Sequence, residues 1–225
     1  MSSIVAIIWT AVIVLAGPIA GLLARKPLAA RQKPRILIYA GSAVNLIIIG
    51  AITVIIDIYR GGLALSVVHW AMPVSRFVVW SIGSAIVLIL ISLGVYALLR
   101  KLNRPPSAIV MSLLTETTSE RLLFLILCIL IGFVEEFLFR GFAFLTLSQF
   151  TSSVGLAGAI ATISFALQHG IQDTLGVVRA FVLGILLLIP VLITGSLVPS
   201  IVAHAIVDMF SGLYGRRAMA SLQPN

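Results

Sequence analysis

Long apolar runs dominate the chain, and short segments rich in polar and basic residues separate them. About 20 apolar residues in a helix cross the roughly 30 Å hydrocarbon core of a bilayer. The pattern therefore predicts an all-α, polytopic transmembrane helical bundle with about seven spans. We expect these at Ile4–Leu23, Ile36–Tyr59, Phe77–Leu99, Leu122–Leu147, Val154–Gln168, Ala180–Thr194 and Leu197–Tyr214. The last three are short, which suits helices whose ends are shielded by neighbours.

The distribution of Lys and Arg predicts how these spans are oriented. Twelve of the 15 basic residues lie in loops 24–35, 100–121 and 169–179 and in the tail from residue 215, and two lie in the loop 60–76. Basic loops stay in the cytoplasm, so the N-terminus is predicted outside and the C-terminus inside. Six or eight spans would result if the loop around His69 or the stretch Ile109–Leu114 entered the bilayer. We favour an interfacial loop anchored by Trp70 and Arg76.

Composition excludes a soluble globular protein. The chain is 60% hydrophobic and 10% charged, with a mean hydropathy of +1.19, whereas soluble domains carry about 25% charged residues. We expect one membrane domain over residues 1–225, with lead-in spans and a cytoplasmic loop in 1–117 and a core in 118–212. The net charge of +8 follows from the basic loops, so we predict a lipid bilayer as partner and no nucleic acid.

Glu135, Glu136 and Arg140 interrupt the fourth run. A charge at the bilayer centre costs roughly 2.5–3.5 kcal/mol, so such residues usually have a function. Glu136 and Arg140 are four residues apart and share a helix face, which fits either a structural ion pair or an active site. Glu135 points about 100° away and has no basic residue one turn along. It therefore suits a group that accepts and later returns a proton.

Two further polar pairs lie at one-turn spacing in later spans. Phe165 is followed by His169 at the end of the fifth span, and His204 is followed by Asp208 in the seventh. Each pair alone fits a structural role: an interfacial histidine, and a satisfied buried hydrogen bond. Together with the glutamates they supply histidines and carboxylates on three spans that can adjoin in a short-looped bundle.

Two chemistries fit these residue types. A glutamate and a histidine can polarise a water for attack on a peptide carbonyl, and a second histidine can donate to the resulting oxyanion. Alternatively, His169, His204 and Asp208 could bind zinc and leave one position open. The chain has no HExxH helix of the zinc proteases and no G-x-S-x-G elbow. We predict no metal and no other cofactor.

The three motifs, in this order and spacing, resemble a known family. Glu135 to Arg140 match EExxxR, Phe165 to His169 match FxxxH, and His204 to Asp208 match HxxxN/D. This is similar to the CPBP intramembrane proteases, which include the type II CAAX prenyl endopeptidases and the abortive-infection-like membrane proteins. The resemblance covers about residues 118–212.

The resemblance implies roles for these residues. Glu135 and His169 would activate the attacking water, His204 and Asp208 would form the oxyanion site, and Glu136 and Arg140, with Phe165, would support them. The prenyl proteases have Asn where this chain has Asp208, and an ionised Asp would repel an oxyanion.

Two function classes follow for an integral protein that we expect in a prokaryotic cell membrane. The first is an intramembrane endopeptidase that cuts a membrane-tethered peptide or protein. The alternative is a non-proteolytic membrane scaffold or regulator, for example of the bacteriocin self-immunity type. The complete set of catalytic-type residues favours the enzyme.

Overall fold

The computed structural model describes residues 2–23, 34–102, 110, 111, 113–172 and 174–220, and side chains between residues 3 and 215. Every regular element in these ranges is helical, and seven helices are long and apolar enough to cross a membrane. This confirms the predicted all-α bundle of seven spans. The spans are α1 (Ser2–Leu23), α3 (Arg35–Tyr59), α4 (Val74–Lys101), the α6–α7 segment, α8 (Val154–Gln168), α9 (Thr174–Thr194) and α10 (Val198–Ala220).

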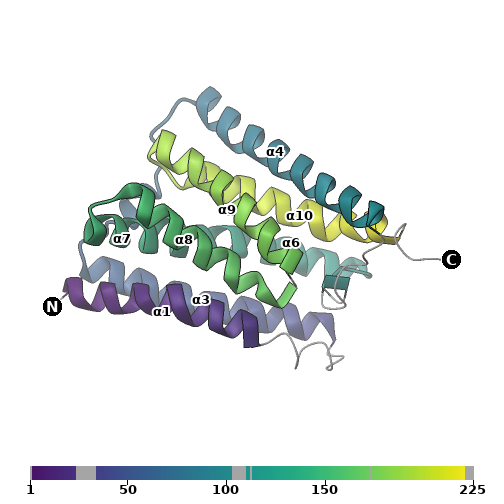
Figure 1. Ribbon diagram of the computed structural model, residues 1–225, viewed down its shortest axis with the longest axis horizontal. Helices are drawn as coiled ribbons and strands as arrows, with labels where there is room; N and C mark the ends of the chain where they lie inside the picture. Colours follow the sequence, from purple (N-terminus) through teal and green to yellow (C-terminus); the bar gives the residue numbers. More distant parts are fainter. Residues whose placement is uncertain (1, 24–33, 103–109, 112, 173, 221–225) are drawn as a thin grey trace.

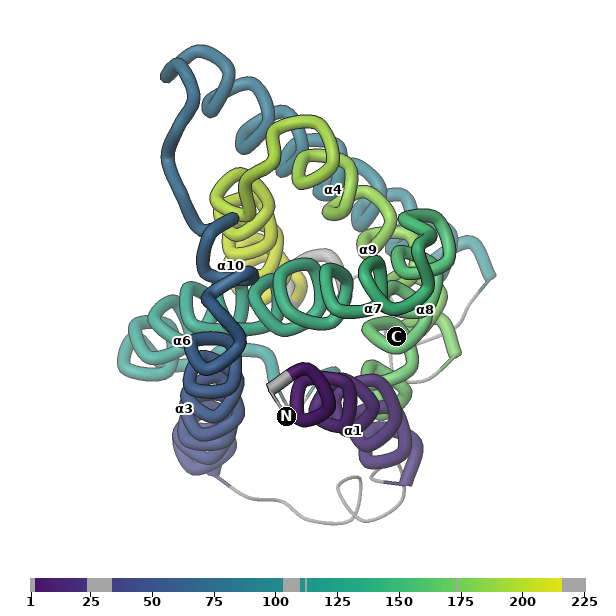
Figure 2. The backbone as a smooth tube through the Cα atoms, turned by 90° about the vertical axis from the view of Figure 1, so that its left-hand side faces the viewer, coloured from purple at the N-terminus to yellow at the C-terminus, as the bar shows by residue number. Residues whose placement is uncertain are grey.

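The fourth span divides the bundle into two groups. It runs without a break through α6 (Thr118–Glu136), a π-helical segment η2 (Phe137–Ala143) and α7 (Phe144–Thr151). In Figure 2 it crosses the view between α10 and α4 on one side and α1 and α3 on the other. Its 34 residues extend about 50 Å, more than the roughly 30 Å hydrocarbon core, so this span is either inclined or extends beyond the hydrocarbon core.

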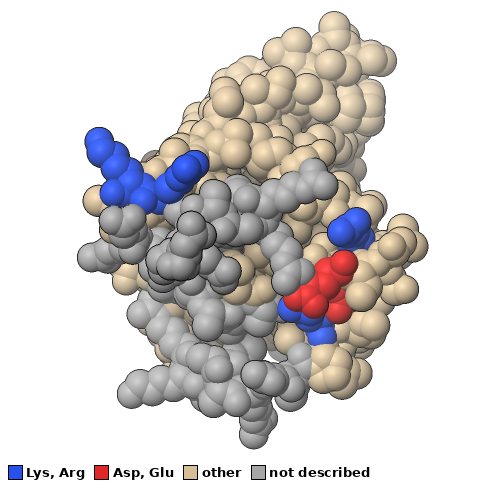
Figure 3. Space-filling model, turned by 90° about the vertical axis from the view of Figure 1, so that its right-hand side faces the viewer, with Lys and Arg blue, Asp and Glu red and all other residues tan. Residues whose placement is uncertain are grey.

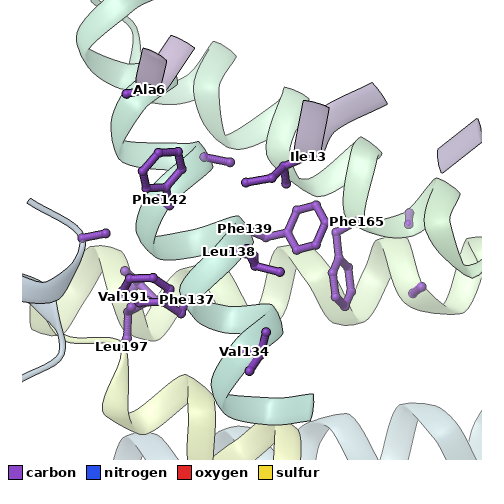
Figure 4. Packing of buried hydrophobic residues seen from close by; sticks show 14 residues of the cluster. Ala6, Ile13, Val134, Phe137, Leu138, Phe139, Phe142, Phe165, Val191 and Leu197 are labelled. Atoms are coloured by element: carbon purple, nitrogen blue, oxygen red, sulfur yellow. The ribbon is translucent and has the colours of Figure 1, made fainter. Parts of the chain in front are cut away.

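Contacts between the helices are continuous through this central span. α10 packs on both α4 and α6, α3 packs on α6, and α8 packs on α1, α7 and α9 (Figure 1). At the centre, aromatic residues of η2 meet α8, where Phe139 and Phe165 lie 5.4 Å apart in an edge-on arrangement (Figure 4). The π-helical segment is buried at all seven positions, so the polar residues beside it are set in an apolar core.

Local sequence explains where the fourth span begins. Thr117 accepts a hydrogen bond from the backbone of Glu120 at 3.2 Å, and the Glu120 carboxylate accepts one from the backbone of Thr117 at 3.1 Å. This capping box satisfies two of the backbone donors that the first helical turn leaves unpaired. Arg35 adds an ion pair to Glu116 at 2.7 Å, at the charged end of the molecule that Figure 3 shows.

The sixth span differs from the prediction. We expected it at Ala180–Thr194, but α9 begins six residues earlier, at Thr174. Arg179 was assigned to a loop because of its charge, and it lies instead inside the helix. Its guanidinium donates to the hydroxyl of Tyr96 at 3.3 Å, which gives the charge a polar partner within the bundle. The helix can therefore continue through it.

The alternatives of six or eight spans are not needed. Between α3 and α4 the chain forms a short 3₁₀ turn, η1 (Leu65–Val67), and no further span. Trp70 packs on Phe77 at a centroid distance of 3.9 Å, and Arg76 donates to the carbonyl of Ile193 at 2.8 Å. Of the other candidate stretch, Ile109 and Ser112 lie outside the described residues.

Candidate active site

The polar residues of the three motifs meet at the junction of α6, α8 and α10. Glu135 and Glu136 end α6, His169 directly follows α8, and His204 and Asp208 lie one turn apart on α10. The sequence separation between Glu136 and His204 is 68 residues, yet the Glu136 Oε1 and the His204 Nδ1 lie 2.8 Å apart. The structure therefore brings the first and third motifs into direct contact.

Gly132 permits this contact between α6 and α10. A Cβ at this position would lie 3.0 Å from two backbone atoms of α10, the nitrogen of Ala205 and the oxygen of Ile201. Glycine thus allows the two helix backbones to touch one turn before Glu136. This close approach carries His204 within reach of the glutamates.

Arg140 is almost fully buried, at 2% exposure, and Glu136 is completely buried. The guanidinium donates to Glu136 Oε1 at 3.0 Å and to the carbonyl of Gly184 at 3.1 Å, and it stacks on the ring of Phe165 at 4.1 Å. A side chain at position 184 would meet Arg140 Nη2 at 3.2 Å, so glycine leaves room for the guanidinium. Arg140 therefore ties the first motif to both α8 and α9.

His204 is the most connected residue of the site. Its Nδ1 faces Glu136, while its Nε2 lies 3.8 Å from Glu135 Oε2 and 3.6 Å from Asp208 Oδ2. A carboxylate ion paired with Arg140 can only accept, which assigns a proton to Nδ1. The other ring nitrogen is then directed towards Glu135 and Asp208. Phe165 contacts this ring edge-on at 5.9 Å and limits its rotation.

His169 is oriented by the end of its own helix. Its Nδ1 lies 2.8 Å from the carbonyl oxygen of Phe165, and its ring packs against the Phe165 ring at 4.8 Å. A carbonyl oxygen can only accept, so Nδ1 carries a proton and Nε2 of the neutral ring is a free acceptor. The Phe165 ring thus contacts both histidines, whereas the sequence pointed only to its contact with His169.

A small cavity joins the second and third motifs. It has a volume of about 20 Å³, and its walls include His169, His204, Asp208 and Arg179. That volume is enough for one water molecule with polar partners. Glu135 does not line this cavity. Its nearest partner among the site residues of α8 and α10 is His204. Within the described residues, Glu135 Oε2 has no hydrogen-bond partner.

A larger, mostly apolar cavity of about 220 Å³ adjoins the small one. Both are lined by Gln172, Arg179 and Asp208. The other walls come from α4, α6, α10 and the segment around Leu113. Sequence reasoning missed this region because Arg179 was counted among loop residues. A basic residue preceded by the apolar stretch 175–178 was the available signal.

The described residues do not fit a zinc site. No three His, Cys, Asp or Glu side chains among them are grouped closely enough to hold a metal ion.

Comparison with known families agrees with these motifs. Residues 117–210 match the family model described as type II CAAX prenyl endopeptidase Rce1-like. Over this segment, which is less than half of the chain, the protein is similar to that family. The match begins at the capping residue Thr117 and includes the three motifs, and it confirms the resemblance to the CPBP proteases. The protein is thus an integral membrane protein that is similar, over this segment, to a family of membrane proteases. No curated protein and no solved structure matches the chain.

Proposed function

We propose that the Rce1-like domain is an active intramembrane endopeptidase that cleaves a membrane-tethered peptide with a water activated by Glu135 and His169. One observation carries the proposal. His169, His204 and Asp208 line a cavity large enough for a water, and Glu135 lies 3.8 Å from His204 beside them. Burying ionisable side chains of this kind in a membrane costs free energy, so they usually have a function.

The two groups proposed to activate water both have a free acceptor. Glu135 Oε2 lacks a hydrogen-bond partner among the described residues, and His169 presents Nε2 because Nδ1 is held by Phe165. In the proposed reaction the water oxygen attacks the peptide carbonyl carbon while Glu135 takes its proton. When the C–N bond breaks, the same proton passes to the leaving amine.

His204 is proposed to stabilise the oxyanion that forms in between. A donor that is already oriented needs no reorganisation when charge develops. Glu136 fixes Nδ1 and Arg140 fixes Glu136, so Nε2 keeps its direction. Nε2 donates to the oxyanion in the doubly protonated form of the ring, in which both nitrogens are donors. Asp208 lies beside Nε2, and in protonated form it would donate a second hydrogen bond to the same oxygen.

The adjoining cavity supports a substrate with apolar residues next to the scissile bond. Its walls are mostly apolar side chains such as Leu99, Leu114 and Phe124, and polar groups occur where it meets the site, at Arg179 and Asp208. A peptide lying there would place apolar side chains among apolar walls and its backbone near the polar residues. The family match makes prenylated peptides one group to test.

The decisive experiment is cleavage of membrane-tethered peptides by the purified chain. The panel contains the same apolar peptides with and without a prenylated cysteine. We expect wild type to cleave at least one of them, and Glu135→Gln to lower turnover by at least about 10²-fold. The variant should keep the wild-type melting temperature because the amide has almost the same shape. Undiminished cleavage by a folded Glu135→Gln protein would remove Glu135 from the mechanism. Absence of cleavage by wild type across the panel would favour the scaffold alternative.

A further inference from the structure

A second polar cluster lies at the opposite end of the spans from the charged end of Figure 3. It surrounds Arg60, which directly follows α3, near the start of α1 and the end of α7 (Figure 1). A cavity of about 570 Å³ opens beside it, and its polar wall consists of Arg60, Ser3, Ser66, Thr146 and Gln149. The three-motif site uses none of these residues.

The Arg60 side chain is 7% exposed and is only partly satisfied. One amino group donates to the Thr146 hydroxyl, and the guanidinium lies 5.0 Å from the centre of the Phe142 ring. Within the described residues, Nε and Nη2 have no hydrogen-bond partner. Leaving buried donors unpaired costs about 1–3 kcal/mol each, and more for charged groups.

The neighbouring carboxylate does not satisfy these donors. Asp57 is completely buried, and its two oxygens accept from the backbone nitrogens of Ala64 at 3.0 Å and Leu65 at 2.9 Å. Its nearest approach to Arg60 Nη2 is 3.8 Å, which is beyond hydrogen-bond distance. Burial lowers the pKa of Arg60, and Asp57 only partly opposes this. An anion in the cavity would favour the charged guanidinium and give it acceptors.

The level of the cavity indicates which anion is available. Ser3 begins the first apolar span, Tyr59 ends the second and Thr151 ends the fourth, so the cavity lies where lipid headgroups meet the spans. Arg60, directly after α3, and Arg76, in the first turn of α4, are the two basic residues of the segment 60–76. A planar guanidinium with two adjacent free N–H groups matches two oxygens of a phosphate.

We propose that the cavity lined by Arg60, Thr146 and Ser66 is a phosphate-binding site that holds the headgroup of a phospholipid. Nε and Nη2 of Arg60 are buried and unpaired in this structure, and a turn of the guanidinium towards the cavity would let them donate to two phosphate oxygens. The proposal is independent of proteolysis. Free inorganic phosphate could make the same hydrogen bonds. The experiment must therefore distinguish a phospholipid headgroup from free phosphate.

The test uses the purified full chain in an uncharged detergent. Three probes are added separately: phosphatidylglycerol, an uncharged galactolipid with the same acyl chains, and inorganic phosphate. Bound lipid is counted by native mass spectrometry and the melting temperature is measured. The variants are Arg60→Gln, and Gln149→Trp, which fills the cavity and leaves the contacts of Arg60 in place. Arg76→Gln is the matched control, because Arg76 lies in the first turn of α4 and outside the cavity wall.

We expect wild type and Arg76→Gln to retain one phosphatidylglycerol more than Arg60→Gln and Gln149→Trp, and to gain several degrees in melting temperature from this lipid alone. If inorganic phosphate gives the Arg60-dependent gain and phosphatidylglycerol does not, the site binds free phosphate and the headgroup assignment is wrong. Equal lipid retention and equal melting shifts in wild type, Gln149→Trp and any folded Arg60→Gln protein would overturn the proposal. An equal gain from the galactolipid would also overturn it, because that lipid has no phosphate.

Discussion

Arg140 contributes to the protein mainly through the residues that it holds. It fixes Glu136, which in turn fixes His204, and it also binds the backbone of α9 and the face of Phe165. The residues proposed to do chemistry, Glu135 and His169, do not contact it in these hydrogen bonds. The same motif therefore contains a positioning group and a reacting group.

Replacing Arg140 by Ala should lower stability as well as activity. The change leaves Glu136 as a buried carboxylate without its cation, and breaking such a pair costs about 3–5 kcal/mol. We expect a clear fall in the melting temperature of the purified protein. Arg121→Ala is the control, because Arg121 is exposed near the start of the same helix. Wild-type melting by Arg140→Ala would show that the ion pair is not structural.

Asp208 separates the water-based mechanism from a zinc mechanism. If it donates to an oxyanion, Asp208→Asn should keep activity within about tenfold of wild type, because an amide also donates. Activity should resist EDTA, and elemental analysis should find no stoichiometric zinc. Zinc that copurifies and is lost in Asp208→Asn would contradict this, since an amide is a much poorer zinc ligand than a carboxylate.

At the scale of elements, the site depends on how closely α6 and α10 approach. The contact is made at Gly132, and the polar residues follow one turn later, where α6 passes into the π-helical segment. Such π-helical insertions are often found at functional sites. Here the segment brings the Arg140 guanidinium within hydrogen-bond distance of the Gly184 carbonyl. Three of its phenylalanines, Phe137, Phe139 and Phe142, lie in the hydrophobic core.

The Gly132→Ala variant should test this contact. Its Cβ would lie 3.0 Å from backbone atoms of α10, so α10 must shift by a few tenths of an ångström and the Glu136–His204 hydrogen bond should weaken. We expect lower activity together with a lower melting temperature. Gly83→Ala is the control, since nothing lies within 4 Å of its added Cβ, and alanine in a helix is normally favoured by roughly 1 kcal/mol. Equal effects of the two changes would show that the contact at Gly132 does not position the site.

At the scale of the whole molecule, the charged helix ends gather at one side of the bundle. Arg35, Glu116 and Glu120 form ion pairs there, and α4 ends in Arg100 and Lys101 at the same end. The excess of basic residues predicts that this side faces the cytoplasm. The larger cavity beside the proposed site also lies among the helix ends of this side.

The predicted orientation can be measured by cysteine labelling in cells. In a Cys128→Ser background, an impermeant thiol reagent added outside should label Ser152→Cys and should not label Ser119→Cys. Both positions are exposed and lie at opposite ends of the fourth span. Removal of the buried native cysteine leaves one thiol per variant. The reverse pattern would place the N-terminus in the cytoplasm.

The sequence by itself determined the number of spans and the residues that matter chemically. Apolar length sets where a helix can cross a bilayer, and the charged residues Glu135, Glu136 and Arg140 stand out there because they are costly. The pairing of Glu136 with Arg140 was also predictable, because residues four apart on a helix are neighbours. The start of α9 was not predictable from the sequence. Arg179 interrupts the apolar run there, whereas in the folded protein the helix continues through this residue.

The tertiary structure alone decided which distant residues meet. Nothing local to Glu136 or His204 indicates their hydrogen bond, because it depends on the packing angle and close approach of α6 and α10 at Gly132. The same holds for Tyr96, which makes Arg179 acceptable inside a helix, and for Thr146, which binds Arg60 from 86 residues away. Local patterns specify helices and their faces, whereas a site built from several helices exists only once their side chains are packed together.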